Sequence, residues 1–483
     1  TNKGTIYLKT SMTLDSYSNT GTHSTSKLKG NYVQTSTGKL NLALDSTSDY
    51  SKFDVTGDVN LSSNANIEID VKNNASNISD SDSFTDIISA TNTLTTSTFN
   101  VSDNTLAYNG SGGVDLIANE TGLTTIKNAV TEATKKAGEI LDAVTNNGFK
   151  TFLNTLGTQK EVAKAVETFI PGDNAATTSA TTQIVNTMQN IVELRQRQVS
   201  STSGINSGDE LMTDKQMWIK PFVGKSIQGS KDGISGYDVN FYGLGLGYDN
   251  EIAKDSRLGF GLFYTDAKVK ASDVEQSTNM NNYTVLIYGN TPVLDENTQF
   301  MYQLGYSIQD NKGIKKVTGF DDMTSKYRSK AMSLDLKLMR DYKLSNTLNT
   351  KPIIEASVRR FETPTYTETG SNTRILSNSN TQKQLSVGNI LEYSINEKSK
   401  LITDTRVGYN FDHDKSTVSY MIDGATEATS LSGIDNGGIT YGLGLAYETI
   451  SNDNLTFDVG YNLQGEGKDF QNHSLSIKFV YKF

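Results

Sequence analysis

The C-terminal stretch SLSIKFVYKF, residues 474–483, alternates apolar with mostly polar side chains up to its last residue. A period of two is the pattern of a β-strand with one apolar face. Five residues make up that face: Leu475, Ile477, Phe479, Tyr481 and Phe483. In water such a strand promotes aggregation at its edge, whereas a closed barrel in lipid has no free edge. The stretch therefore predicts the last strand of a transmembrane β-barrel.

The region from about residue 210 to residue 483 reads as a series of hairpins. About twelve strands are predicted, at 216–227, 234–248, 256–270, 280–291, 298–309, 326–341, 351–362, 381–396, 399–414, 437–449, 454–463 and 473–483. An even number of strands fits a single-chain outer-membrane barrel. Connections after even-numbered strands are short, and several after odd-numbered strands, including 310–325, 363–380 and 415–436, are long. This parity predicts a periplasmic rim with the short turns and Phe483, and an outer rim with the long loops.

The two faces of these strands can be assigned from their side chains. In YGLGLGY (242–248) and YGLGLAY (441–447), Tyr and Leu are predicted to face lipid. Seven glycines are predicted to face the lumen: Gly243, Gly245, Gly247, Gly259, Gly261, Gly442 and Gly444. Charged residues are expected on the same inward face: Asp335, Lys337, Glu392, Asp404, Arg406 and Lys478. Because glycine weakens a strand unless another group approaches closely, we expect a helix in the lumen to lie against these glycines.

Residues 1–113 are rich in Ser, Thr, Asn, Asp and Gly and contain short alternating runs such as Leu40, Leu42 and Leu44. Turn residues follow every ten or so positions. This spacing favours stacked β-coils, in which each coil covers its neighbour. A plain β-sandwich is the alternative.

The period changes to that of a helix between residues 114 and 209. Apolar residues from Leu123 to Val144 predict one helix, which Gly148 is expected to end. After a breaker at residues 171–174, a mostly polar helix is predicted over about 175–199. We expect it to thread the barrel, with five residues marking it: Ile184, Met188, Ile191, Arg195 and Arg197. A surface helix of a small helical domain is the alternative.

The composition and the short motifs of the sequence exclude several classes of function. The 483 residues contain no run of about 18 apolar residues, so no transmembrane helix is expected. A formal net charge of −10 argues against nucleic acid as a partner. The absence of cysteine suits passage through an oxidising periplasm, and equally a reducing compartment. No nucleophile elbow, phosphate loop or metal-binding motif occurs, so we expect neither an enzyme nor a cofactor nor a metal site.

Three stretches resemble the autotransporter family of type V secretion. The C-terminal strand resembles the segment that the barrel-assembly machinery reads. Residues 217–249, MWIKPFVGKSIQGSKDGISGYDVNFYGLGLGYD, resemble the opening of an autotransporter translocator barrel. Residues 38–71 resemble the C-terminal end of a β-helical passenger, with Phe53, Asp54 and Gly57 in its aromatic–Asp–x–x–Gly step. The resemblance covers the last 270 or so residues and part of the N-terminal segment.

The expected protein is mainly β: a twelve-stranded antiparallel barrel with a helix in its lumen, preceded by a short helical segment and a β-helix-like passenger remnant. The expected domains are 1–113, 114–209 and 210–483. The resemblance implies a translocation unit in the bacterial outer membrane that exports and anchors its own passenger. Lipid, the assembly machinery, periplasmic chaperones and the passenger are the implied partners. Because an exported chain needs a signal peptide, we expect a longer precursor upstream of Thr1.

Some members of this family cut their chain within the helix, which makes Asn186 and Asn190 candidate cleavage positions. Two alternatives to the translocation unit stay open. One is an outer-membrane diffusion channel whose N-terminal part is a plug or adhesive domain. The other is a surface adhesin rich in β-structure.

Overall fold

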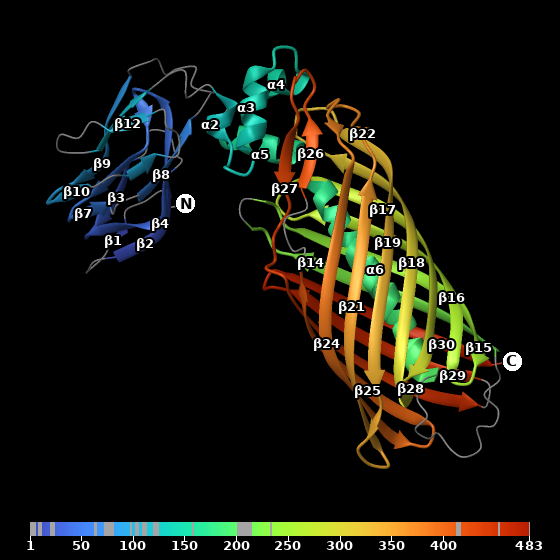
Figure 1. The fold of residues 1–483 in the computed structure, drawn as a ribbon. Helices are drawn as coiled ribbons and strands as arrows, with labels where there is room; N and C mark the ends of the chain where they lie inside the picture. The colour runs from blue at the N-terminus through green and yellow to red at the C-terminus, as the bar shows by residue number, and fades with distance from the viewer. Residues whose placement is uncertain are drawn as a thin grey trace. The chain divides into compact units, whose positions relative to one another are not determined.

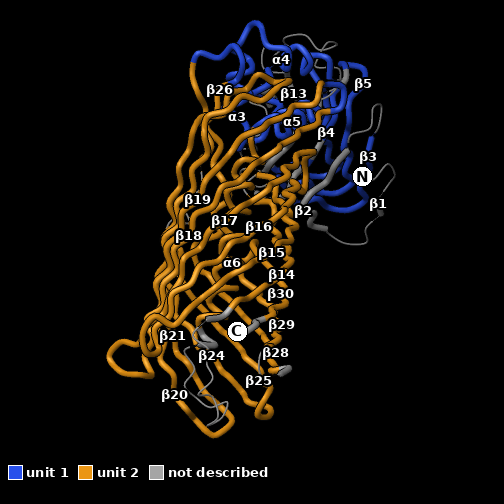
Figure 2. The backbone as a smooth tube through the Cα atoms, turned by 90° about the vertical axis from the view of Figure 1, so that its right-hand side faces the viewer, with its two compact units in different colours: residues 1–170, 318–320, 422–426 blue, residues 171–317, 321–421, 427–483 orange. Residues whose placement is uncertain are grey.

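The fold was analysed in a computed structural model (Figure 1). It describes residues 6–7, 12–19, 25–61, 65–71, 82–96, 99–101, 106–108, 114–118, 125–156, 159–199, 215–231, 234–411, 417–452 and 455–482. The chain divides into two compact units (Figure 2). Unit 1 comprises residues 1–170, 318–320 and 422–426, and unit 2 comprises residues 171–317, 321–421 and 427–483.

Unit 2 is a closed antiparallel barrel. Its strands are β14 (Lys215–Gln228), β15 (Tyr237–Ala253), β16 (Ser256–Ala271), β17 (Gln276–Val293), β18 (Asp295–Lys315), β19 (Met323–Arg340), β21 (Leu348–Thr363), β24 (Asn378–Asn396), β25 (Ser399–Asn410), β28 (Ile439–Asn452), β29 (Leu455–Glu466) and β30 (Phe470–Lys482). Pairing of β14 with β30 and of β19 with β21 closes the ring. The two-residue β20 (Tyr342–Lys343) only extends a turn. These twelve strands confirm the predicted mainly-β fold class.

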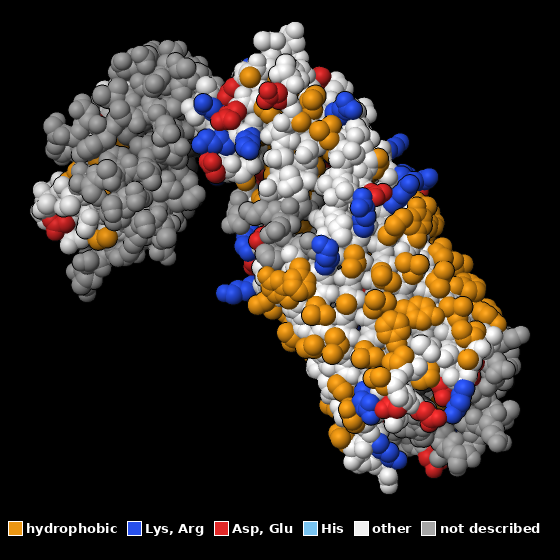
Figure 3. All heavy atoms as spheres, viewed as in Figure 1, with side chains coloured by type: hydrophobic (Ala, Val, Ile, Leu, Met, Phe, Trp, Pro, Cys, Tyr) orange, Lys and Arg blue, Asp and Glu red, His pale blue; other side chains and the backbone are white. Residues whose placement is uncertain are grey.

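The strands alternate as their sequences predict. On β16, Leu258, Phe260 and Leu262 are 42–49% exposed, while Gly259 and Gly261 between them are buried. On β30, Leu475 and Phe479 are 44% and 40% exposed and Ile477 is half-buried. The side chains of Tyr481 and Phe483 lie outside the described residues. Because the exposed apolar residues repeat around the ring, unit 2 has an apolar outer band of the kind that contacts acyl chains (Figure 3).

The connections differ between the two rims. The turn between β15 and β16 is Lys254–Asp255, and Glu397–Lys398 joins β24 to β25. At the other rim, the connections after β21 and β25 contain a four-stranded sheet of β22 (Tyr366–Thr367), β23 (Arg374–Ile375), β26 (Thr417–Met421) and β27 (Thr429–Ser432). The predicted long loop at 310–325 is shorter, at 316–322, because β18 and β19 continue their alternation beyond the predicted strand ends.

The β-part of unit 1 has two sheets built mainly from parallel pairs. One sheet contains β1 (Ile6–Tyr7), β3 (Thr25–Lys29), β6 (Lys52–Val55), β9 (Ser83–Ala90), β13 (Val114–Ala118) and β12 (Leu106–Tyr108). The other contains β10 (Leu94–Thr96), β7 (Val59–Leu61), β4 (Tyr32–Ser46), β8 (Ala65–Val71) and β11 (Phe99–Val101), with β2 (Met12–Asn19) and β5 (Asp49–Tyr50) beside β4. Phe53 pairs with Ile88, one coil further along the chain. This parallel stacking agrees with β-coils rather than a sandwich of hairpins.

Side chains from both sheets meet in one apolar core. It includes Leu28, Leu42, Phe53, Val59 and Phe84, each at most 1% exposed. Gly57 lies where the chain passes Gly30 and Asn31, so closely that a Cβ at Gly57 would overlap the Gly30 carbonyl. The amide of Asp58 donates a 2.8 Å hydrogen bond to Asn31 Oδ1 at this crossing. The glycine of the aromatic–Asp–x–x–Gly step is therefore needed for a close approach of backbone to backbone.

The helices of unit 1 differ from the sequence expectations in two respects. In place of one helix from Leu123 to Val144 there are α2 (Ile126–Ala129) and α3 (Lys135–Ala143), separated by a turn. Gly148 does not end a helix but begins α4 (Gly148–Leu153), because Asn147 caps it by accepting a 2.9 Å hydrogen bond from the Lys150 amide. α5 (Gln159–Phe169) follows. β13 extends the β-segment past residue 113, where the domain boundary was expected.

None of the described helices combines the length and the apolar character needed to cross a membrane.

Candidate functional site: a helix inside the barrel

The lumen of the barrel contains α6 (Gly172–Val199) (Figure 1). It begins directly after Pro171, a position next to the helix start where proline is tolerated. Its N-terminal end contacts the rim with the long loops, since Asn174 Nδ2 donates a 3.2 Å hydrogen bond to Tyr366 Oη. Near its C-terminal end, Arg195 binds Asp249 on β15, close to the short turn at Lys254. The helix therefore runs from one rim of the barrel to the other.

One face of α6 is apolar and packs on the wall formed by β14 to β17. Ile184, Met188 and Ile191 are at most 3% exposed and belong to the same buried cluster as aromatic rings of the barrel. Those rings are Trp218, Phe222, Tyr237, Phe241, Phe263 and Tyr288. The three apolar residues predicted to mark the pore helix thus lie together against one side of the lumen.

The predicted glycines do lie on inward positions, but the group that approaches them is not the helix. Beside Gly243, Gly245, Gly247, Gly259 and Gly261, the nearest side chains are the rings of Trp218, Phe222, Phe263 and Tyr288. α6 then packs on these rings. The expectation of direct contact between helix and glycine is therefore wrong for this wall, because cross-strand aromatic rings fill the space that the missing side chains leave.

Replacing Gly247 by Ala is expected to destabilise the barrel, because the added Cβ would overlap the indole of Trp218. Overpacking of this kind costs about 1–3 kcal/mol. The urea midpoint of unfolding in detergent, read from heat-modifiable gel mobility, measures the effect. Gly442→Ala is the matched control, because its nearest neighbour would be Arg406 Cβ at 3.7 Å. Equal midpoint shifts for the two variants would contradict this assignment.

Arg195 anchors the C-terminal part of α6 through a buried carboxylate. Its Nε and Nη2 donate hydrogen bonds of 2.8 Å to the two oxygens of Asp249. Arg257 Nη1 donates to the same carboxylate at 2.8 Å, and Tyr288 Oη donates to it at 2.9 Å. The Arg195 and Asp249 side chains are 5% and 1% exposed. One carboxylate thus compensates two buried guanidinium groups, a strong geometry for an ion pair.

Glu193 holds the opposite face of the helix. Its carboxylate accepts hydrogen bonds from Lys337 on β19 and Arg406 on β25. Both cations also pair with Glu355 on β21, and Arg406 pairs with Asp404 at 3.0 Å. A single helix residue therefore connects three strands on the side of the ring opposite β14 to β17.

Three glutamines extend this network. Gln189 Oε1 accepts a 2.9 Å hydrogen bond from Arg359 Nη2, and Arg359 in turn binds Asp335. Gln303 Nε2 on β18 donates to Gln196 Oε1 at 2.8 Å, and Gln196 Nε2 donates to the Gly289 carbonyl at 2.6 Å. These amides satisfy lumen polar groups that would otherwise be buried without partners.

The sequence analysis did not identify Gln189, Glu193 and Gln196 as contact residues. Their contacts could have been anticipated, because the three residues follow one another at intervals of four and three positions and therefore lie on one face of a helix. Asp249 and Trp218 were also missed. Arg195 was predicted and does contact the barrel, whereas the side chain of Arg197 lies outside the described residues.

At the long-loop rim, an ion cluster joins α6 to β18 and to the connection after β21. Lys315 Nζ lies 3.6 Å from Asp173 Oδ1 and 2.6 Å from Glu368 Oε1, and all three side chains are nearly fully buried. Burial raises the pKa of the Glu368 carboxyl, and the Lys315 ammonium opposes that shift only in part. The rings of Tyr327 and Tyr366 stack beside the cluster with centroids 4.2 Å apart. These contacts hold the first turn of α6 at the rim.

A polar cavity of about 90 Å³ remains between α6 and the wall formed by β21, β24, β25, β28, β29 and β30. Asn186, Asn190, Glu355, Arg406 and Gly442 are among its lining residues. Gly444 lies on the same wall, beside Asp404 and Asn462. Such a volume holds a few water molecules. Among the described residues, α6 thus lies beside a polar, water-sized space in the lumen.

Asn186 and Asn190, the candidate cleavage positions, both face this cavity. Within the described residues, Asn186 Oδ1 is buried and accepts no hydrogen bond. Cleavage at either residue stays a prediction. Among all the residues that the structure describes, no group of three or more His, Cys, Asp or Glu side chains is arranged to hold a metal ion.

A closed ring of strands with an apolar outer band and a helix fixed in its lumen defines a class of outer-membrane barrel proteins. Residues 217–462 match the family model for the autotransporter beta-domain, so the chain belongs to the autotransporter family. It is an outer-membrane translocation unit.

The chain is also similar to two outer membrane proteins of Rickettsia. The chain is 25% identical over 335 residues to outer membrane protein A of Rickettsia conorii, covering 64% of this chain and 16% of that protein. It is 23% identical over 403 residues to outer membrane protein B of Rickettsia prowazekii, covering 77% and 24%. The chain thus spans less than a quarter of the length of these relatives.

Among solved structures, the translocator domain of NalP from Neisseria meningitidis is 11% identical with a TM-score of 0.49, covering 62% of this chain and 97% of that one. The transport unit of AIDA-I from Escherichia coli is 15% identical with a TM-score of 0.45, covering 60% and 97%.

Proposed function

We propose that α6 is the tether of an exported passenger and that the barrel keeps it in the lumen after export. The observation that carries this proposal is the pair of buried ion clusters around Glu193 and Arg195, which join the helix to strands on opposite sides of the ring. A chain that leaves the lumen at the Gly172 end emerges at the long-loop rim. The polypeptide upstream of α6 is thereby anchored at the cell surface.

In this proposal, the β-part of unit 1 is the membrane-proximal end of the passenger. Its parallel coils, with Phe53 of one coil paired to Ile88 of the next, offer a strand edge on which upstream coils can stack. Each added coil buries apolar surface outside the cell, which favours outward movement without nucleotide hydrolysis. The domains of the proposed protein are therefore a passenger end, a helical linker and a barrel.

The proposed partners are lipid, the protein's own passenger, the barrel-assembly machinery and periplasmic chaperones. The alternating face of Leu475, Ile477 and Phe479, with Phe483 at its end, is proposed as the segment that the assembly machinery recognises. The translocation unit itself has no enzymatic role in this proposal. Any adhesive or catalytic activity belongs to the passenger in this proposal.

A diffusion channel is the weaker candidate. A solute would have to pass a lumen that α6 crosses from one rim to the other. The buried ion pairs between α6 and several strands also have no role in diffusion, because a helix fixed in the lumen obstructs the passage of solutes.

The orientation can be tested with two epitope tags in the same full chain. One tag precedes Thr1, and the other is inserted in the short turn at Ser345. We expect a protease added to intact cells to remove the first tag and to reach the second only after the outer membrane is permeabilised. Protection of the first tag, or removal of the second in intact cells, would contradict the proposal. Each tag serves as the control for the other.

A further inference from the structure

The outer wall of the barrel carries a second feature, which we call the cationic collar. It consists of outward-facing basic residues on β16, β18, β19, β21 and β24, all on the long-loop side of the apolar band: Lys268, Lys270, Lys312, Lys326, Arg328, Lys330, Arg360 and Lys383. Figure 3 shows Lys and Arg side chains gathered at this edge of the hydrophobic surface. The carboxylates on the same face of these strands are Asp266, Asp310 and Glu362, and Asp238 on β15 lies directly opposite Lys270. Eight cations therefore face four carboxylates, in a chain whose net charge is −10.

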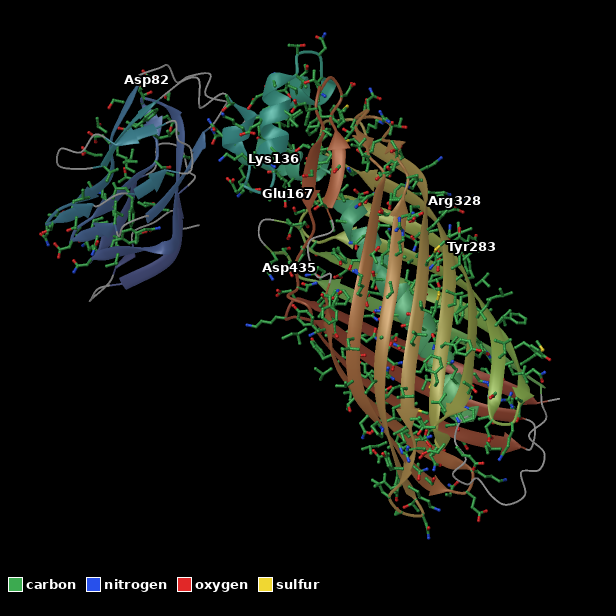
Figure 4. The ribbon with its side chains drawn as sticks, in the orientation of Figure 1. Asp82, Lys136, Glu167, Tyr283, Arg328 and Asp435 are labelled. Carbon is green, nitrogen blue, oxygen red and sulfur yellow. The ribbon has the colours of Figure 1, made fainter. Side chains whose placement is uncertain are left out.

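β19 shows how abruptly the collar begins. Its outward positions from Lys326 to Lys330 are basic, and its next outward positions from Met332 to Leu338 are apolar. On β16, the exposed Tyr264 precedes Lys268 by two outward positions. Tyrosines at the edge of an apolar band mark the interface between acyl chains and headgroups. The collar therefore lies at headgroup depth, as Arg328 beside Tyr283 illustrates in Figure 4.

The strand register brings like charges together. Lys312 on β18 lies directly opposite Lys326 on β19, and both are exposed. Like charges in this position are unfavourable in the absence of a counter-ion. Arg328 pairs with Asp310 at 2.7 Å and Arg360 with Glu362 at 2.9 Å. Among the described residues, no carboxylate forms an ion pair with Lys268, Lys270, Lys312, Lys326 or Lys330.

The strands next to β16 balance their own charge. Lys225 on β14 pairs with Asp238 on β15 at 3.2 Å. Asp238 also lies directly opposite Lys270 of the collar in the strand register.

A hollow of about 370 Å³ lies within the collar. Arg328 and Lys330 line one side of it, and Pro364, Ser377 and Asn378 line the other. Its lining combines two cations with hydroxyl and amide groups, which are donors that bind phosphate oxygens. Glu362 also lines the hollow, and Arg360 compensates its carboxylate at 2.9 Å. Its position next to the apolar band leaves it open to a molecule whose tails lie in the bilayer.

We propose that the cationic collar binds the phosphate-bearing headgroup of a lipid in the outer leaflet. Lys312, Lys326 and Lys330 supply the charge, and the hollow beside Arg328 receives one phosphate. The acyl chains lie along the exposed Leu334, Leu336 and Leu338 of β19. A soluble acidic protein fits less well, because the bilayer covers the apolar edge that adjoins the collar.

The test uses the full chain in detergent, with native mass spectrometry to measure retention of bisphosphorylated lipid A. The variant is K312Q/K326Q/K330Q, and the matched control is K254Q/K343Q/K398Q, which removes three exposed lysines from the short-turn rim. A basic residue near an anionic membrane surface contributes about 1 kcal/mol, so we expect the collar variant to bind at least ~10-fold more weakly after screening by salt. The control is expected to bind as the unaltered chain does.

Further arms identify the ligand. A dephosphorylated form of the same glycolipid is expected to bind as weakly as the collar variant, and inorganic phosphate is expected not to displace the lipid. Heat-modifiable mobility verifies that each variant is folded, and K330Q alone serves as a milder variant that alters only the hollow. Unchanged binding by the collar variant, equal loss in the control, or equal binding of the dephosphorylated lipid would overturn the proposal. If inorganic phosphate alone displaced the lipid, the ligand of the collar would be a free anion and not a lipid headgroup.

Discussion

Replacing Asp249 by Asn is expected to lower the free energy of unfolding of the barrel by about 3–5 kcal/mol, the usual cost of breaking a buried ion pair. Asn has nearly the same shape but no charge. Arg195 and Arg257 would then face each other in a buried site, where both now donate to the same carboxylate at 2.8 Å. Asn would also present a donor group to guanidinium groups that can only donate.

Urea unfolding in detergent, followed by heat-modifiable gel mobility, measures this effect. Asp238→Asn is the matched control, because it removes the carboxylate from an exposed ion pair with Lys225. The Asp238 side chain is 42% exposed and the Lys225 side chain is 48% exposed. Exposed pairs of this kind contribute about 0–1 kcal/mol. A double variant, Asp249→Asn with Arg195→Gln, is expected to cost less than the sum of the two single changes, because the first already breaks the contact. Equal effects of Asp249→Asn and Asp238→Asn would contradict the anchoring role of Asp249.

The barrel could be predicted from sequence because its main determinant is local. Alternation along a strand requires no knowledge of the partner strand. The lipid-facing Leu244, Leu246 and Phe479 and the inward-facing Lys337 and Arg406 were therefore assigned from their own neighbours. The parity of short and long connections is likewise a property of the sequence order. Only the strand ends moved, as at β18, where pairing with β17 and β19 continues to Lys315.

The contacts of the lumen could not be predicted in the same way. Glu193 binds Lys337 and Arg406, which lie 144 and 213 residues further along the chain. These pairs depend on the rotation and depth of α6 in the barrel, and its own sequence fixes neither. The glycines illustrate the same limit. Their inward direction followed from alternation, but the approach of Trp218 to Gly247 depends on the register between β14 and β15.

Local signals at helix ends were ambiguous. Gly148 suits the end of one helix and the beginning of the next, and the cap from Asn147 favours the second. In the β-part of unit 1, short alternating runs indicated strands, whereas the parallel pairing of β6 with β9 became visible only in the structure.

The helix in the lumen can be removed as a unit. Deleting residues 172–199 from the full chain takes away the apolar face around Ile184 and Met188 and both ion clusters. A ring of twelve strands is wider than the eight-stranded barrels that side chains alone can fill. We therefore expect the deletion to turn a lumen that contains a helix into an open aqueous pore, with a conductance several times that of the intact chain. Deleting residues 126–153 removes helices of unit 1 instead and serves as the control.

Single-channel recording in planar bilayers on folded protein is the most direct measurement. The intact chain and the control deletion are predicted to give small conductances that match each other, and the 172–199 deletion is predicted to give large, long-lived steps. The same small conductance from all three proteins would mean that α6 does not fill the lumen, and would contradict the tether on which the proposed export role depends.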